Sequence, residues 1–235
     1  MSARFSGQTV LLAGGTGGLG QAVSLAFLNE GASVAVTYRD QKGLDALARA
    51  AGANGGRLEG IQADVTDEAA VTQLVDDIAR RHGRLDVLVN AVGGYAAGKP
   101  LWEFDTRAFE QMLTMNLRSG FILARAIAPV MLERKRGAIV NVAARAAVDH
   151  AARSAAYAAS KAAAVAMIDS LAADLKGTGV RANSVLPSII DTPANRRAMP
   201  DADFAAWAKP EAIAEVILFL CSDDAKLIHG AAIPV

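Results

Sequence analysis

Short apolar runs alternate with helical segments along the whole chain, and this alternation limits the possible folds more than any other feature. The runs are mostly apolar from end to end, which is typical of strands buried on both faces of a parallel sheet. They occupy residues 9–13, 33–38, 58–63, 85–91, 137–142, 180–186 and 231–235. Strands separated by helices in this way predict an α/β fold, a doubly wound parallel sheet, in a single domain over residues 1–235.

The composition sets outer limits on function. The chain has 235 residues, 52% of them hydrophobic, and its formal net charge of +0 disfavours nucleic-acid and anionic membrane partners. A single cysteine, Cys221, excludes an internal disulfide and suits a reducing compartment. His82, His150 and His229 lack ligand spacing, so we expect no metal site. The N-terminus lacks the apolar stretch of a signal peptide and no window approaches a membrane span, so we expect a cytoplasmic protein.

A glycine-rich turn at residues 14–20 (GGTGGLG) lies between the first apolar run and a helical segment at 21–29. Glycines let the backbone approach a phosphate closely, and the N-terminus of the following helix favours the phosphate charge. The strand–turn–helix context therefore predicts a dinucleotide site, with an ordinary flexible loop as the alternative. The candidate contacts are Gly14, Thr16, Gly17, Gly18, Leu19 and Gly20.

The end of the second apolar run bears on which dinucleotide is bound. An acidic residue at this point holds the adenine ribose in many dinucleotide sites, whereas a basic residue can hold a 2′-phosphate. Thr37 stands where the acid is expected, and Arg39 follows it. This arrangement favours NADP(H). Asp40 comes slightly later and keeps NAD(H) possible.

Two further motifs follow later strands. Asp64 and Val65 come after the third apolar run, where a carboxylate can accept a hydrogen bond from the adenine amino group. The alternative is that Asp64 only caps the next helix, although Asp67 is the better cap. Asn90, Ala91 and Val92 follow the fourth run, at the carboxyl ends of the strands where ligands bind in open α/β sheets.

Tyr157 and Lys161 are four residues apart on a predicted helix at 154–177, which puts both side chains on one face. A nearby ammonium favours the phenolate, so we expect the pKa of Tyr157 to be lowered toward neutrality. The pair is a candidate general acid or base, and a surface pair is the alternative. The same helix is apolar nearly all round, which predicts contact with a second subunit in a homodimer or homotetramer rather than a monomer.

Asn116 interrupts a long helical segment at 106–132. Because its side chain competes for backbone groups, Asn116 marks either a kink whose freed carbonyl holds a water or a satisfied buried asparagine. Residues 188–209 form a long connection at the carboxyl edge and are a candidate substrate lid. Phe204 and Trp207 are candidate substrate contacts, unless they pack the lid onto the body. Further pocket candidates are Tyr95, Trp102 and Met199.

Together these residues resemble the classical short-chain dehydrogenase/reductase family over nearly the whole chain and in the same order. The matching positions are Gly14, Gly18, Gly20, Asp64-Val65, Asn90-Ala91-Val92-Gly93, Asn116 and Tyr157-Ala-Ala-Ser-Lys161. The resemblance implies a Rossmann-type fold, a small-molecule substrate and hydride transfer to or from a nicotinamide cofactor.

The resemblance also implies roles for individual residues. Tyr157 is expected to donate the proton, and Lys161 to hold the nicotinamide ribose and tune Tyr157. Asn116 is expected to anchor a water in a proton relay. The turn at 187–192 is expected to hold the carboxamide, and its matching positions are Pro187, Ile190 and Thr192.

One departure from the family pattern affects the substrate prediction. Ala144 stands where the family has the serine that binds the substrate carbonyl. The stretch from Ala144 and Arg145 to residue 149 and the lid at 191–207 are similar to dihydropteridine reductases, which also lack that serine. We therefore expect reduction of a quinonoid dihydropterin-like substrate. The alternatives are a carbonyl or alcohol oxidoreductase working without the serine, acting for example on a ketone or a 3-oxoacyl thioester, and a catalytically impaired cofactor-binding sensor or scaffold.

Overall fold

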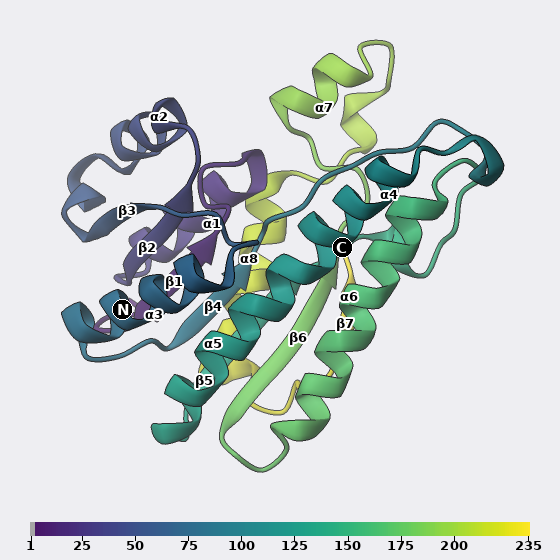
Figure 1. Ribbon diagram of the computed structural model, residues 1–235. Coiled ribbons are helices and arrows are strands. Elements are labelled where there is room, and N and C mark those ends of the chain that lie inside the picture. The colour runs from purple at the N-terminus through teal and green to yellow at the C-terminus, as the bar shows by residue number, and fades with distance from the viewer. Residues whose placement is uncertain (1–2) are drawn as a thin grey trace.

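The computed structural model describes residues 3–235 and shows a seven-stranded parallel sheet flanked by helices (Figure 1). The strand order is β3-β2-β1-β4-β5-β6-β7, and each neighbouring pair is parallel. The predicted doubly wound sheet is confirmed. The strands are β1 Thr9–Ala13, β2 Ser33–Tyr38, β3 Leu58–Gln62, β4 Val87–Asn90, β5 Gly137–Val142, β6 Val180–Leu186 and β7 Ala232–Pro234.

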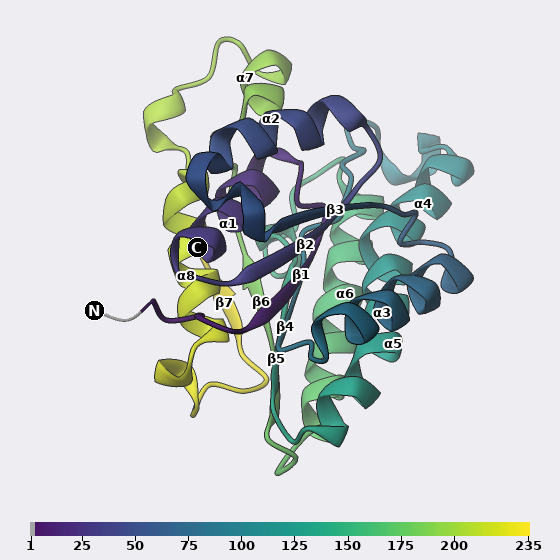
Figure 2. The ribbon, with the colours of Figure 1, turned by 90° about the vertical axis from the view of Figure 1, so that its left-hand side faces the viewer.

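Helices cover both faces of the sheet, as the turned view shows (Figure 2). One face carries α1 (Gly18–Asn29) and α8 (Pro210–Cys221), and the other carries α3 (Glu68–His82), α5 (Ser119–Glu133) and α6 (Ala155–Asp174). Side chains of β1 alternate between the two cores. Leu12 packs in the core that contains α1 and α8, and Leu11 packs in the opposite core. Both are fully buried, which explains why this run is apolar without alternation.

The helical segment predicted at 106–132 is interrupted, as expected. A π-helical turn at Thr114–Arg118 separates α4 (Thr106–Leu113) from α5. Asn116 lies at the centre of that turn. A π turn inside a helix leaves backbone groups out of the regular pattern, and such turns are frequent at functional sites.

Two other helices lie where the sequence analysis predicts none. In α2 (Gln41–Ala51), Asp40 provides the N-cap by accepting a hydrogen bond from the N–H of Lys42 at 3.2 Å. The candidate lid, residues 188–209, contains α7 (Pro193–Ala198), which Thr192 caps by accepting from the N–H of Asn195 at 3.2 Å. Among the helices of residues 3–235, none has the length and apolar character needed to cross a bilayer.

The carboxyl ends of the strands meet at one edge of the sheet. The chain order reverses between β1 and β4, so the loops after these two strands leave in opposite directions. Gly14 follows β1, and Ala91 follows β4 and donates its N–H to the carbonyl of Ala13 at 2.9 Å. A crevice at such a switch point is the general ligand site of open α/β sheets.

Asp86 holds the opposite edge of the sheet. Its side chain is 4% exposed and accepts from the N–H of Thr9 at 2.8 Å and from the Arg84 guanidinium at 2.6 and 2.7 Å. Its main chain donates to the Thr9 carbonyl and accepts from the N–H of Ala138, both at 2.9 Å. One residue thereby joins β1, β4 and β5.

Replacement Asp86→Ala is expected to lower the free energy of unfolding by about 2–4 kcal/mol, because the N–H of Thr9 is left buried without its partner. Urea denaturation measures the change. The matched control is Asp77→Ala, which removes a surface ion pair with Arg80 and should alter stability by less than about 1 kcal/mol. Equal losses in the two variants would contradict the special role of Asp86.

Candidate functional site

The glycine-rich turn packs against two other loops, and side chains are excluded at the contacts. Gly14 has a φ of +79°, and a Cβ there would lie 3.1 Å from the carbonyl carbon of Ala91. A Cβ on Gly18 would lie 2.6 Å from Cγ2 of Thr192, at the start of the lid. The turn is therefore held between the loop after β4 and the base of the lid.

The N-terminus of α1 is open to a ligand. Its N-cap, Gly17, has no side chain to satisfy the first N–H groups, and no acidic residue lies in the first turn. Unpaired N–H groups and the helix dipole suit a phosphate. Of the predicted contacts, Gly14, Thr16 and Gly17 line the neighbouring pocket, whereas the Leu19 side chain is buried in the core. These features fit the diphosphate of a dinucleotide.

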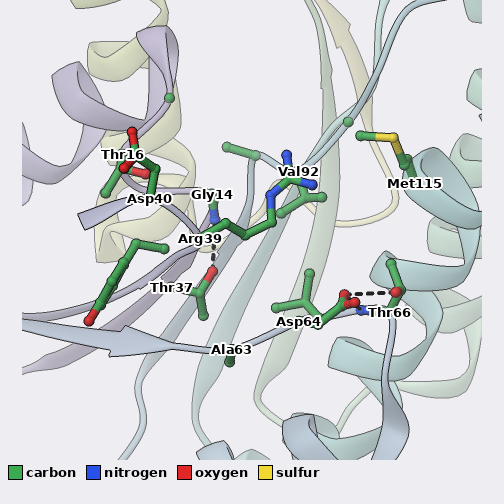
Figure 3. Close-up of a pocket in the computed structure, with 15 residues that line it drawn as sticks. Gly14, Thr16, Thr37, Arg39, Asp40, Ala63, Asp64, Thr66, Val92 and Met115 are labelled. Atoms are coloured by element: carbon green, nitrogen blue, oxygen red, sulfur yellow. Dashed lines mark hydrogen bonds between the residues drawn. The ribbon is translucent and has the colours of Figure 1, made fainter. Parts of the chain in front are cut away.

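A pocket extends from this turn across the ends of β2 and β3 (Figure 3). Thr37 is buried, and its hydroxyl accepts from the N–H of Gly14 at 3.0 Å. Thr37 stands where an acidic residue was expected, and this hydrogen bond shows that it stabilises the glycine-rich turn instead. The Arg39 side chain lies across the pocket, and the Asp40 carboxylate lies near Thr16 (Figure 3). These two charged side chains occupy different parts of the pocket.

Asp64 lies on the far wall of the same pocket (Figure 3). It accepts from the hydroxyl of Thr66 at 2.7 Å and from the Thr66 N–H at 2.9 Å. These two bonds hold the pKa of Asp64 below its usual value, and the charge of Arg39 acts in the same direction. Asp67, not Asp64, caps α3 by accepting from the N–H of Ala70 at 2.8 Å. Val65 also lines the pocket.

The loop after β4 forms the pocket's third side. Asn90 is buried; it donates to Oδ1 of Asn141 at 2.9 Å and accepts from the N–H of Val92 at 3.2 Å. Its side chain therefore fixes the loop, while Ala91 and Val92 line the pocket. A Cβ on Gly93 would lie 3.0 Å from Nζ of Lys161. Gly93 is a site residue missing from the predicted contacts, although it belongs to the motif that the sequence analysis identified.

Asn116 is 2% exposed, and both polar atoms of its side chain form hydrogen bonds. Its Oδ1 accepts from the N–H of Gly94 at 2.8 Å, and its Nδ2 donates to the Gly94 carbonyl at 3.1 Å and to the Ser160 hydroxyl at 2.9 Å. Asn116 is therefore a satisfied buried asparagine, and it lies within an irregular helical turn. A water on a freed carbonyl of that turn stays a prediction.

Lys161 lies on α6 and is 5% exposed. Its Nζ donates to the carbonyl of Val142 at 3.1 Å and lies 6.0 Å from the ring centroid of Tyr157. Burial lowers the pKa of Lys161 from 10.5 to about 8. Tyr157 is partly buried on the same helix, beside Lys161.

The predicted lowering of the Tyr157 pKa is wrong for this structure. Burial raises the pKa of Tyr157 to about 12, and the neighbouring Tyr95 acts in the same direction. The Lys161 ammonium approaches the ring from 6.0 Å and is itself weakened by burial, so the desolvation of the phenolate outweighs its attraction. Tyr157 is therefore held in its protonated form at neutral pH.

Ala144 is buried in extended backbone just after β5. Ser154, one helical turn before Tyr157, is buried, and its hydroxyl donates to the carbonyl of Ala151 at 2.6 Å, so this proton is not free for a substrate oxygen. The side chain of Arg145 is exposed, and its N–H donates to the carbonyl of Pro187 at 2.9 Å. Arg145 thus joins the loop after β5 to the loop after β6.

The lid segment is more ordered than an irregular loop. Asp191 pairs with Arg196 and Lys209 at its base. Ile190 forms a bridge with Ala208, which closes the segment into a loop with neighbouring ends. In Figure 1 it stands above the carboxyl edge of the sheet.

The aromatic residues of the lid pack mainly on each other. Trp207 is buried, and its ring centroid lies 4.8 Å from that of Phe204. Arg196 covers the Phe204 ring at 4.7 Å. The contact with Phe204 lies within the lid and accounts for part of the burial of Trp207. The alternative stated for both residues, packing of the lid onto the body, stays a prediction. Met199 and Trp102 remain exposed at 36% and 84%.

Comparison with known proteins agrees with this geometry. The family model described as short chain dehydrogenase matches residues 8–203. The chain is 34% identical to the D-threitol dehydrogenase of Mycolicibacterium smegmatis, covering 97% of this chain and 91% of that protein. It is 30% identical to the 3-oxoacyl-(acyl-carrier-protein) reductase of Thermotoga maritima, covering 99% and 97% of the two chains.

Solved structures with either nicotinamide cofactor are similar to this one. NAD+-bound xylitol dehydrogenase has a TM-score of 0.91 at 26% identity, covering 99% of this chain and 98% of that chain. ElxO with NADP bound has a TM-score of 0.92 at 26% identity, covering 97% and 96%. With its sheet order, its glycine-rich turn and its Tyr157–Lys161 helix, the chain belongs to the short-chain dehydrogenase family of nicotinamide-dependent oxidoreductases.

Proposed function

We propose that this oxidoreductase interconverts a carbonyl and an alcohol, with Tyr157 as the proton-transferring group. The observation that carries the proposal is the cluster of Tyr157, buried Lys161 and satisfied Asn116 beside Gly93, at the carboxyl edge of the sheet. Nicotinamide, when bound, supplies or accepts the hydride. The named relatives, which act on a polyol and on a 3-oxoacyl group, support this class of reaction.

The residues have distinct tasks in the proposed reduction. Tyr157 has a pKa raised to about 12, so it carries its proton at neutral pH and gives it to the substrate oxygen as negative charge develops there. The Lys161 ammonium would stabilise the phenolate left behind, and it would hold the nicotinamide ribose when the cofactor is bound. Asn116 holds the π-helical turn, whose irregular backbone supports a water that returns a proton to the site.

We further propose that NADP(H) is preferred over NAD(H). Arg39 lies across the pocket near the end of β2, where a cation pairs with a 2′-phosphate (Figure 3). Asp40 is engaged as the N-cap of α2, which leaves it less suited to a ribose. Gly14, Gly18 and the N-terminus of α1 are proposed to hold the diphosphate. The other proposed contacts are Asp64, Val65, Asn90, Ala91, Val92, Pro187, Ile190 and Thr192.

Reduction of a quinonoid dihydropterin is a second candidate. It is favoured by Ala144, because an imine-type conjugated system does not need the serine hydroxyl that a ketone oxygen uses. None of the relatives named above is described as a pterin reductase. Residues 188–209 are proposed as the lid over either substrate. The sensor or scaffold alternative has no support, since those relatives are enzymes.

A second copy of the chain is the proposed partner. The surface of α6 that faces away from the sheet carries exposed alanines, among them Ala155, Ala159 and Ala166. On neighbouring α5, Phe121 is 50% exposed and lines an apolar hollow with Met167. Small and aromatic side chains of this kind suit close helix packing between subunits.

Replacement Tyr157→Phe tests the proposed proton donor. Turnover is expected to fall about 10²–10⁴-fold, while cofactor binding is retained, because only the hydroxyl is lost. NADPH and NADH oxidation is followed by absorbance with ketones, 3-oxoacyl thioesters and quinonoid dihydropterin as substrates. Unchanged turnover would refute the role of Tyr157. Turnover of the pterin without turnover of ketones would favour the second candidate.

Replacement Arg39→Ala tests the cofactor preference. We expect the Kd for NADPH to rise about tenfold and the Kd for NADH to change little, because only NADPH carries the 2′-phosphate. Calorimetric titration of both cofactors measures this. Lys42→Ala is the matched control, since it removes a nearby positive charge that does not line the pocket. Parallel loss of affinity for both cofactors would contradict the assignment.

Replacement Lys161→Met is expected to stabilise the chain while abolishing turnover. Burial lowers the pKa of Lys161 from 10.5 to about 8, so the folded state disfavours its charge. That penalty is complete below pH 8 and disappears as the pH rises past 10.5, where the group is neutral in both states. The free energy of unfolding should therefore rise by about 1–3 kcal/mol at pH 7.

Urea denaturation of both proteins at neutral and at alkaline pH measures the difference. The gain should shrink as the pH increases, whereas a gain from better packing would be the same at every pH. If Lys161→Met is less stable than the wild-type protein at pH 7, the buried charge of Lys161 does not destabilise the folded state as stated here.

A further inference from the structure

Tyr95 is an exposed aromatic residue in direct contact with the proposed proton donor. Its ring centroid lies 4.9 Å from that of Tyr157, and the two rings meet edge to face at 77°. Tyr95 nevertheless has 73% of its surface exposed. The contact with Tyr157 thus leaves most of the Tyr95 side chain open.

The segment that carries Tyr95 is held at both ends. Asn116 bonds the N–H and the carbonyl of Gly94, the residue just before it, at 2.8 and 3.1 Å. On the other side, the N–H of Gly98 donates to the carbonyl of Arg153 at 2.9 Å, which ties the loop to the segment preceding α6. The ring is therefore presented by an anchored backbone.

An anchored aromatic ring that is left open next to a reacting group is well placed to contact a ligand. An aromatic ring contributes most to the binding energy of a ligand when a flat group of that ligand stacks on the ring or meets it at an edge. Ala144 offers no hydroxyl to orient a substrate, and Ser154 is engaged with the carbonyl of Ala151. Packing against the walls of the site then gains weight in orienting the substrate, and the Tyr95 ring is such a wall in contact with Tyr157.

Given the proposed carbonyl reduction, we infer that Tyr95 determines specificity by packing its ring against a flat unsaturated group attached to the carbonyl carbon of the substrate. The preferred substrates are then aryl or conjugated ketones rather than saturated ones. The ring supplies this preference, and the Tyr95 hydroxyl is not required for it. A flat heterocycle satisfies the same contact.

Two ketones of similar size test the inference, acetophenone and cyclohexyl methyl ketone, which differ in whether the ring is flat. The wild-type protein should favour acetophenone in kcat/KM. In Tyr95→Leu, the ratio of the two kcat/KM values should fall about tenfold. In Tyr95→Phe, the ratio should be retained because the ring remains. Phe109→Leu, an exposed aromatic on α4, is the control and should leave the ratio unchanged.

A binding measurement separates this inference from the proposed function. Saturation-transfer NMR compares the two ketones on the protein mixed with NADP+, where no reduction takes place. Absence of turnover with every ketone would refute carbonyl reduction, yet stronger binding of acetophenone that is lost in Tyr95→Leu would still support the contact. An unchanged preference in Tyr95→Leu, in turnover or in binding, would overturn the role of Tyr95.

Discussion

Asn116 is the residue on which the geometry of the site depends. Its amide joins the loop after β4, through both backbone groups of Gly94, to α6 through the Ser160 hydroxyl. These bonds bring Gly93 against Nζ of Lys161 and place Tyr95 against Tyr157. A buried amide with all its groups satisfied specifies one arrangement, because any other leaves polar groups unpaired in a low-dielectric interior.

The sequence was sufficient to predict the sheet and to indicate the candidate site, because both depend on local patterns. Apolar runs, the glycine-rich turn and the Tyr157–Lys161 spacing are visible in a single stretch, and the structure contains each of them. The interruption at Asn116 was also predictable, since asparagine is a poor helix-interior residue. In contrast, helix α2 depends on the Asp40 cap, which the sequence analysis read only as a possible ribose contact.

Other properties of the site arise from tertiary contacts and were not predictable. The pKa of Tyr157 rises because surrounding segments bury it, and nothing in the spacing of Tyr157 and Lys161 gives the extent of that burial. The hydrogen bond from Gly14 to the Thr37 hydroxyl joins residues 23 positions apart. The contact of Tyr95 with Tyr157 crosses a still longer separation. Each of these depends on how strands are ordered in the sheet.

Buried polar side chains that lower the stability of the fold cluster at the carboxyl edge of the sheet, where the proposed reaction takes place. Asn90, Asn141 and Ser184 stand in register across β4, β5 and β6, and all three are buried. Among residues 3–235, Nδ2 of Asn141 and Oγ of Ser184 have no protein partner. Lys161 adds a buried charge a short distance away, next to the end of β5. An apolar edge would fold more stably, so the stability given up here supports a functional site rather than the fold.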